Sequence, residues 1–341
     1  MASSKRSYSR KRELFLDCTL ILHPSNVRWL TGFDAGIVLM GKDEDYLIVP
    51  ELEYERALEV VDWLNVVKGP RGALWKKALE LCNGPFFADL SYLNFRTAIT
   101  LMTELGAGDA SKTVRRARMS KDEEELSRIK KALEIAERAF LETWKELEEG
   151  TTELAAAGAL EAHMREFGAQ EFAFPTIVAF GPNSSKPHAV PGEAQLSFGS
   201  VALFDFGAVY GGFRSDITRT YVPDKEPYAS WYHAVLEAVN AALKALKPGA
   251  RGKDVDAAAR EVLAEYGFEK AFVHGLGHGV GADIHEPPFL SPSSEDVVSK
   301  GAVVTVEPGV YFKGQGGVRV EQLVYVDYNP IVLNSTPVMW W

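Results

Sequence analysis

An internal repeat in the second part of the chain limits the possible folds more than any other feature of the sequence. Residues 147–150 align with residues 246–249, and residues 166–168 align with residues 265–267, both at an offset of 99 residues. Each copy continues into a loop with histidine, which holds His188 in the first copy and His274 and His278 in the second. Such a repeat predicts two similar halves about a pseudo-twofold axis. A site at their junction would take ligands from both halves.

The chain is long enough for more than one buried core. It has 341 residues, 46% of them hydrophobic, which predicts two domains. Its formal net charge of -10 argues against a nucleic-acid partner, because a phosphate backbone requires clustered Lys and Arg. The sequence shows neither an apolar run of about 18 residues nor a signal-peptide core. We therefore expect a cytoplasmic protein with no membrane partner and a small or peptide-like substrate.

The first part of the chain alternates short apolar runs with helix-like stretches, which predicts an α/β domain. Residues 106–119 are small and basic with little apolar period, as expected of a linker. This places the predicted domains at residues 1–118 and 119–341. The pattern Ser-x-x-Glu at Ser120 and Glu123 predicts a capping box, and a long amphipathic helix follows it.

Two further features belong to the first domain. Cys18 and Cys82 are far apart and each lies in a mostly apolar stretch, so we expect buried free thiols rather than a disulfide. The basic run from Lys5 to Arg12 predicts a solvated, partly frayed tail.

Residues 201–222 form two apolar segments around a Tyr-Gly-Gly turn, which predicts a β-hairpin. With a two-residue loop at 210–211, Asp205 and Asp216 would face each other directly. Two opposed carboxylates repel each other and lose hydration in an apolar hairpin, so a cation must offset them. From the hairpin alone, a divalent metal and a basic side chain such as Arg219 are equally good candidates.

Other stretches supply more candidate ligands. A Gly-rich segment holds His274, His278 and His285, and neutral imidazole is a common metal ligand. Glu307 ends a Val-rich strand, where a carboxylate is costly unless it is paired or coordinated. Glu321 lies two residues after Arg319, which predicts one face of a strand, with a surface ion pair as the alternative.

These residues make an oxygen-dominated ligand set: Asp205, Asp216, His278, Glu307 and Glu321. Such a set suits Mn, Co, Fe or Zn in a paired site. Two adjacent metals share bridging carboxylates and a hydroxide nucleophile. The sequence therefore predicts hydrolysis of an amide-like bond.

The order of these ligands resembles a known family. An Asp, a second Asp eleven residues later, His in Gly-His-Gly-Val-Gly, Glu in Glu-Pro-Gly and Glu in Arg-Val-Glu are similar to the pita-bread metallopeptidases, which include methionine aminopeptidase, aminopeptidase P, prolidase and creatinase. The resemblance covers residues 120–341, and the α/β domain in front resembles the Xaa-Pro branch. It implies an α/β (α+β) fold, with an N-terminal creatinase-like domain and a C-terminal pita-bread domain built on a pseudo-twofold repeat.

The resemblance also implies roles for individual residues. It implies two divalent metal ions per chain, Mn or Co, with Zn or Fe as alternatives. Asp205 would hold one ion, His278 and Glu307 the other, and Asp216 and Glu321 would bridge them. His188 and His285 would contact substrate and stabilise the tetrahedral intermediate; Arg319 would orient a ligand carboxylate, Glu307 would also shuttle a proton, and His274 is a weaker candidate.

The implied reaction is hydrolysis of the Xaa-Pro bond at the N-terminus of dipeptides or short peptides by a metal-bridging hydroxide. The short front domain favours an Xaa-Pro dipeptidase. An Xaa-Pro aminopeptidase is the alternative, since dipeptidase-type members often carry a basic residue where this chain has Phe289. The resemblance further implies a homodimer. A non-catalytic binding protein on the same scaffold and a metallohydrolase with phosphotriesterase side activity are the remaining alternatives.

Overall fold

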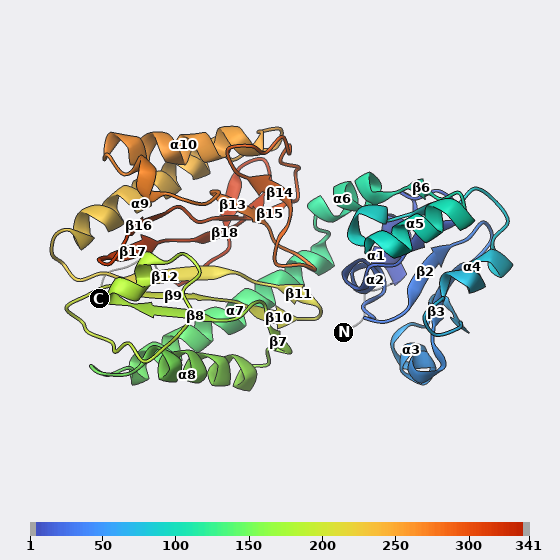
Figure 1. The fold of residues 1–341 in the computed structure, drawn as a ribbon, viewed down its shortest axis with the longest axis horizontal. Coiled ribbons are helices and arrows are strands. Elements are labelled where there is room, and N and C mark those ends of the chain that lie inside the picture. Colours follow the sequence, from blue (N-terminus) through green and yellow to red (C-terminus); the bar gives the residue numbers. More distant parts are fainter. Residues whose placement is uncertain (1–4, 337–341) are drawn as a thin grey trace. The chain divides into compact units, whose positions relative to one another are not determined.

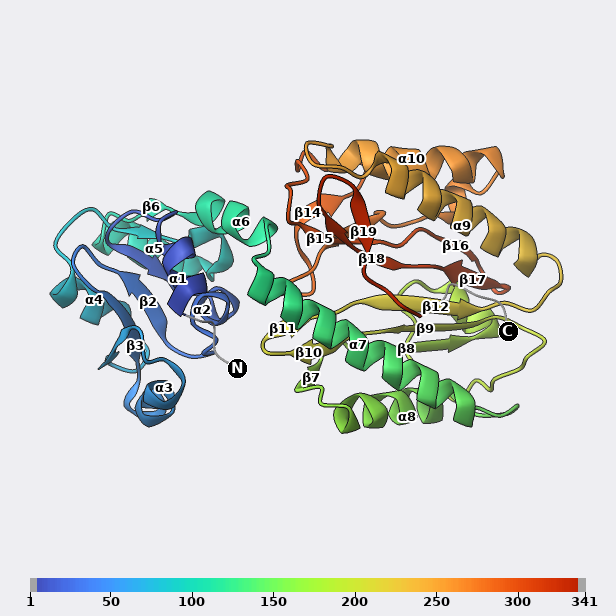
Figure 2. The same ribbon diagram turned by 180° about the vertical axis from the view of Figure 1, so that it is seen from behind.

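The chain forms two compact units, Met1–Arg118 and Met119–Trp341, and each is described by itself (Figures 1 and 2). The structure is a computed structural model that describes residues 5–336. Within this part of the chain, no helix is both long enough and apolar enough to cross a membrane.

The first unit is built on a six-stranded mixed sheet in the order β4-β3-β2-β1-β5-β6. Its strands and helices are β1 (Thr19–Ile21), β2 (Ile37–Met40), β3 (Asp45–Val49), β4 (Asn65–Lys68), β5 (Phe87–Ala88), β6 (Gly108–Asp109), α1 (Lys5–Arg12), α2 (Pro24–Thr31), α3 (Tyr54–Val60), α4 (Trp75–Leu81), α5 (Phe95–Glu104) and α6 (Ser111–Met119). The apolar runs of the sequence became β1, β2, β3 and β5. The predicted α/β character is therefore confirmed.

Two local predictions in this unit are wrong. The basic run is the helix α1 rather than a frayed tail. Arg12 and Tyr8 both bind Asp45 of β3 at 2.9 Å, so the end of this helix is held against the sheet. The expected linker at 106–119 contains β6 and the helix α6, with the Val114 side chain fully buried. Sparse apolar residues are enough for a helix when one of them reaches the core.

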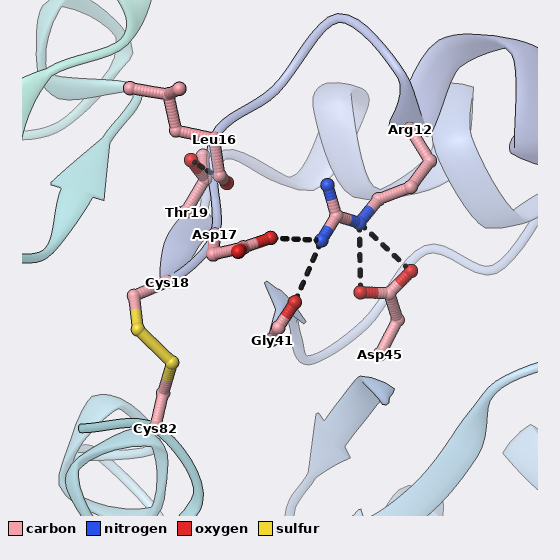
Figure 3. Close-up of a disulfide and its surroundings, with 8 residues drawn as sticks. All are labelled: Arg12, Leu16, Asp17, Cys18, Thr19, Gly41, Asp45 and Cys82. Carbon is pink, nitrogen blue, oxygen red and sulfur yellow. Dashed lines mark hydrogen bonds and ion pairs between the residues drawn. A yellow bond between two sulfur atoms is a disulfide. The ribbon is translucent and has the colours of Figure 1, made fainter. Parts of the chain in front are cut away.

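The expectation of free thiols is also wrong, because Cys18 and Cys82 form a disulfide (Figure 3). Cys18 directly precedes β1, and Cys82 directly follows α4. Packing of α4 beside the sheet brings their Cα atoms to 5.9 Å, within the range that a disulfide requires. A separation of 64 residues in sequence does not reveal this proximity.

Loss of the disulfide is expected to lower the free energy of unfolding of the first unit by about 2 to 4 kcal/mol, since the bond closes a long loop in the unfolded chain. Scanning calorimetry of the protein with and without reductant measures the shift. The double variant Cys18→Ala/Cys82→Ala is the control, because its unfolding must not respond to reductant. Identical thermograms for oxidised and reduced wild type would contradict the prediction.

The second unit carries strands between two pairs of helices, with α7 and α8 on one side and α9 and α10 on the other (Figures 1 and 2). Its elements are α7 (Glu123–Glu146), α8 (Glu153–Glu166), β7 (Glu171–Phe172), β8 (Ile177–Phe180), β9 (Ala202–Phe206), β10 (Ala208–Tyr210), β11 (Phe213–Arg214), β12 (Ile217–Tyr221), α9 (Tyr228–Ala245), α10 (Gly252–Glu265), β13 (Gly277–Gly279), β14 (Glu286–Leu290), β15 (Val303–Val306), β16 (Gly309–Phe312), β17 (Gly316–Arg319), β18 (Gln322–Val326) and β19 (Pro330–Val332). Its sheets have the orders β11-β10-β7, β12-β9-β8 and β14-β13-β15-β18-β19, and β16 pairs with β17.

The internal repeat is visible in these elements. The helices α8 and α10 each have 14 residues and begin at Glu153 and Gly252, which keeps the offset of the sequence repeat. Gly150 and Gly249, which precede them, have φ angles of 91° and 88°, a left-handed conformation that favours glycine. Each half therefore places a helix pair ahead of its strands, as the repeat predicts.

The long helix α7 packs through the predicted apolar stripe. Its Phe140 ring lies 5.3 Å from Phe206 and 5.5 Å from Phe204, both on β9. The capping box, however, uses Asp122 and Glu125, whose side chains each accept the other's backbone N–H at 2.9 Å. The run Ser-Lys-Asp-Glu-Glu-Glu contains two overlapping boxes, and the one two residues later is used.

Candidate metal centre and active site

Three buried carboxylates from both halves of the second unit converge at one point. Asp205 lies on β9, Asp216 directly precedes β12, and Glu321 directly precedes β18. One carboxylate oxygen of each lies within 4.8 Å of those of the other two. Acids that are more than 100 residues apart in sequence thus share one small volume.

The predicted hairpin register is wrong by two residues. Gly211 and Gly212 form the turn, with φ angles of 58° and 81°, because a two-residue turn of this kind needs positive φ at both central positions. As a result Asp205 pairs with Thr218 rather than with Asp216. A shift of two residues keeps side chains on the same face, so both carboxylates still point to the cluster.

Arg319 organises one side of the cluster. Its Nη2 donates to Asp205 Oδ2 at 2.5 Å and its Nε donates to Thr218 Oγ1 at 3.0 Å. Thr218 in turn donates to Glu321 Oε2 at 2.9 Å. Arg319 ends β17, whereas Glu321 lies between β17 and β18, so the predicted sharing of one strand is wrong. Neither residue is on the surface, which rules out the surface ion pair.

His278 and Glu307 form the other side. His278 Nε2 lies 3.1 Å from Glu307 Oε1 and 3.7 Å from Asp216 Oδ2. Thr305 on β15 accepts the His278 backbone N–H at 3.0 Å and donates to Glu307 Oε1 at 2.9 Å. A Cβ at Gly277 would lie 2.1 Å from the Thr305 carbonyl oxygen, so glycine is what allows β13 to bring His278 this close to β15.

Burial and crowding change the protonation of these acids. Burial raises the pKa of Asp216 and of Glu321 well above the usual carboxyl value, and neighbouring carboxylates raise both further. Burial also raises the pKa of Asp205, although Arg319 opposes this. Burial acts on Glu307 in the same direction, but the hydrogen bond and charge of His278 outweigh it and lower the Glu307 pKa to about 2.

The cluster has the properties of a cation site. Asp205 Oδ1 and Glu321 Oε1 are buried and accept no hydrogen bond from the described residues. Arg219, the basic side chain proposed from the hairpin as the alternative to a metal, binds the backbone oxygens of Thr218 and Glu321 instead of the carboxylates. Arg319 and a protonated His278 can neutralise only part of the charge of four buried carboxylates. Divalent ions would complete both the charge balance and the bonding of the two oxygens.

A cavity of about 580 Å³ opens onto the cluster. Asp205, Asp216, His278, Glu307 and Arg319 line it, together with His188, His274 and His285. Apolar residues supply much of the remaining wall: Phe174, Pro175, Ile177, Ala189, Val190 and Phe289. The volume and the few convergent polar groups are typical of a small-ligand site.

The pocket histidines differ in their surroundings. His188 and His285 are solvent-exposed, and the His285 ring centroid lies 4.3 Å from that of His278. Although part of the His285 ring is exposed, partial burial and the charge of His278 lower its pKa, which favours the neutral ring. His274 instead lies 2.9 Å from the hydroxyl of Tyr311, which accepts from Arg319 Nη1 at 2.6 Å. His274 therefore belongs to the network that holds Arg319.

Sequence reasoning missed the neutral residues of the site. Thr218, Thr305 and Tyr311 connect the charged groups through hydrogen bonds. Thr218 lies on the same strand face as Asp216 by its spacing of two, which is a usable signal. Tyr311 and Thr305 have no comparable signal, because their roles depend on contacts across strands.

The chain is similar to known proteins along most of its length. The family model for the creatinase/prolidase N-terminal domain matches residues 6–120, and that for metallopeptidase family M24 matches residues 127–328. An Xaa-Pro dipeptidase of Pyrococcus furiosus is 37% identical over 92% of both chains.

Solved structures give the same picture. The prolidase of Pyrococcus horikoshii has a TM-score of 0.88 at 33% identity, covering 98% of this chain and 99% of the other. An X-Pro aminopeptidase of Thermotoga maritima has a TM-score of 0.87 at 32% identity, covering 97% and 99%.

Proposed function

Because the chain belongs to metallopeptidase family M24, we propose that it hydrolyses the bond between an N-terminal residue and proline in dipeptides or short peptides. The same membership confirms the fold class, with a creatinase-like first domain and a pita-bread second domain, and confirms that the chain is a metal-dependent peptidase. The observation that carries the proposed reaction is the buried acid cluster, in which two oxygens accept no hydrogen bond from residues 5–336, beside a cavity that Asp205 and Asp216 line.

We propose five ligands for two divalent ions, Mn or Co, with Zn or Fe as alternatives: Asp205, Asp216, His278, Glu307 and Glu321. Asp216 and Glu321 are assigned as the pair that both ions would share, and their carboxylates lie in one cluster with that of Asp205. When bound, such ions polarise a carbonyl group and lower the pKa of water to near neutrality.

The other residues of the cavity are assigned by what they can do. His188 and His285 are exposed at the cavity and can donate hydrogen bonds to the oxygen of the scissile carbonyl as charge develops on it. Glu307 uses Oε1 for Thr305 and His278, so Oε2 is the atom proposed to carry a proton to the imide nitrogen of proline. Arg319 keeps Asp205 oriented through its hydrogen bond.

We propose a dipeptidase, with an aminopeptidase acting on longer peptides as the alternative. The named relatives include both kinds of enzyme. Among the described residues that line the cavity, Arg319 is the one Lys or Arg side chain, and it is engaged by Asp205 and Tyr311. It is therefore not free to bind the carboxylate of a dipeptide, which is why the aminopeptidase is kept as the alternative. The homodimer stays a prediction. The domain bounds, 1–118 for the creatinase-like domain and 119–341 for the catalytic domain, also stay a prediction.

The two alternatives are separated by a substrate panel. With Mn or Co added, the protein is expected to hydrolyse Met-Pro and Leu-Pro with a higher kcat/KM than Met-Pro-Ala and Leu-Pro-Ala, with the released N-terminal residue, free Met or Leu, as the product measured. Higher kcat/KM on the tripeptides would establish the aminopeptidase. Tight metal binding without cleavage of any of these peptides would refute the proposed function and favour a binding protein, and preference for an organophosphate ester would favour the phosphotriesterase.

A further inference from the structure

We propose that Glu153, at the first position of α8, is a positioning residue that sets the pose of His188 in the cavity. This inference rests on the proposed function, because it assigns His188 to substrate binding. The carboxylate of Glu153 is fully buried, yet it does not line the cavity that holds the acid cluster.

The hydrogen bonds of Glu153 hold both ends of the loop that carries His188. Glu153 Oε1 accepts from the Phe180 backbone N–H at 2.7 Å, where β8 ends. Glu153 Oε2 accepts from the Gly192 backbone N–H at 2.8 Å, where the loop returns. The Asn183 side-chain amide donates to both oxygens, at 3.0 and 2.9 Å. One side chain thus closes a 13-residue segment into a fixed shape.

The middle of this segment reaches the active site. Pro187, His188, Ala189, Val190 and Pro191 all line the cavity. The Pro187 carbonyl accepts from Arg319 Nη1 at 3.3 Å, and Ser184 Oγ accepts the Gly317 N–H at 2.9 Å. His188 itself is exposed, so its position depends on the loop backbone rather than on packing of the ring.

The hydrogen bonds that Glu153 accepts from the loop require a carboxylate. All three partners of Glu153 are neutral donors, and together they need acceptors on both of its oxygens. A glutamine has the same shape, but its NH2 group cannot accept, so one end of the loop would lose its bond. The first turn of α8 also favours a negative charge through the helix dipole.

The test is a double-mutant cycle with Glu153→Gln and His188→Ala, measured on an Xaa-Pro dipeptide. Glu153→Gln is expected to lower kcat/KM by about 10- to 100-fold, as loss of an orienting partner does, with bound metal unchanged. In the His188→Ala background the same substitution is expected to change kcat/KM by less than about 2-fold, because its effect passes through His188. Additive losses would overturn the proposal, since a general structural role gives additivity.

Hydrogen–deuterium exchange of peptides spanning 180–192 supplies a readout that does not require turnover. Glu153→Gln is expected to speed exchange in this loop, and unchanged exchange would overturn the proposal. The matched control is Glu123→Gln, which removes an exposed acid from the first position of α7 and is expected to leave the loop and kcat/KM unchanged.

A second variant covers the case in which Glu153→Gln does not fold. Asn183→Ala removes one donor from a partly exposed position and is expected to act in the same direction with a smaller loss. If the wild type cleaves no Xaa-Pro peptide, the proposed function fails, while the exchange data still decide whether Glu153 holds the loop.

Discussion

Replacing Asp216 with asparagine is expected to lower kcat/KM on Xaa-Pro dipeptides by at least about 10³-fold, because several kcal/mol of metal-derived stabilisation is lost. Asp216 is central to the cluster, within reach of Asp205, Glu321 and His278. Bound metal, measured by elemental analysis after dialysis, is expected to fall as well. Asp224→Asn is the control, since this exposed acid lies eight residues further along and outside the cluster. Normal metal content and turnover in Asp216→Asn would refute the ligand assignment.

The same substitution should stabilise the protein when metal is removed. Burial raises the folded-state pKa of Asp216 above its unfolded value of about 4, so folding takes up a proton in the pH range between these two values. The stability of the metal-free protein therefore falls as the pH rises from about 4 to the folded-state pKa. In thermal unfolding with chelator present, the Tm is therefore expected to fall more between pH 5 and pH 8 for the wild type than for Asp216→Asn. An equal drop in both proteins would mean that repulsion within the cluster is not what limits the metal-free state.

Replacing His285 with alanine is expected to lower kcat by about 10²- to 10³-fold, as loss of one donor to a developing oxyanion does. The ring is exposed at the cavity and contacts His278, but it has no place in the acid cluster. Metal content is therefore expected to remain normal. Steady-state kinetics on Leu-Pro with parallel metal analysis measures both quantities.

His233→Ala provides the control for this substitution, because His233 is an exposed histidine on α9 that pairs with Glu237. Loss of metal in His285→Ala would show that its role is misassigned. An unchanged kcat would show that the ring does not contact the reacting carbonyl.

The candidate ligands could be predicted because each acid stands in an apolar stretch where only pairing or coordination makes it tolerable. Asp205, Glu307 and Glu321 can each be recognised as a candidate ligand from the apolar residues on either side of it. The register of the hairpin was predicted wrongly because the loop was placed at Tyr210-Gly211, whereas positive φ at both central positions favours Gly211-Gly212. The prediction that Asp205 and Asp216 lie on one face of the hairpin is still correct, because a register error of two residues does not change the face on which a side chain lies.

Local pattern determined the alternating elements of the first unit, the amphipathic helix α7, the duplicated halves and the residue types of the candidate metal centre. These features are carried by spacings of a few residues or by direct repetition, so they can be read along the chain. Tertiary structure alone decided the Cys18–Cys82 disulfide, the packing of α1 against the sheet through Arg12, and the hydrogen bonds between Glu153 and the loop that carries His188. The contacts that make them join residues 27 to 64 positions apart. Their partners are chosen by how helices and strands pack, and no local period records that choice.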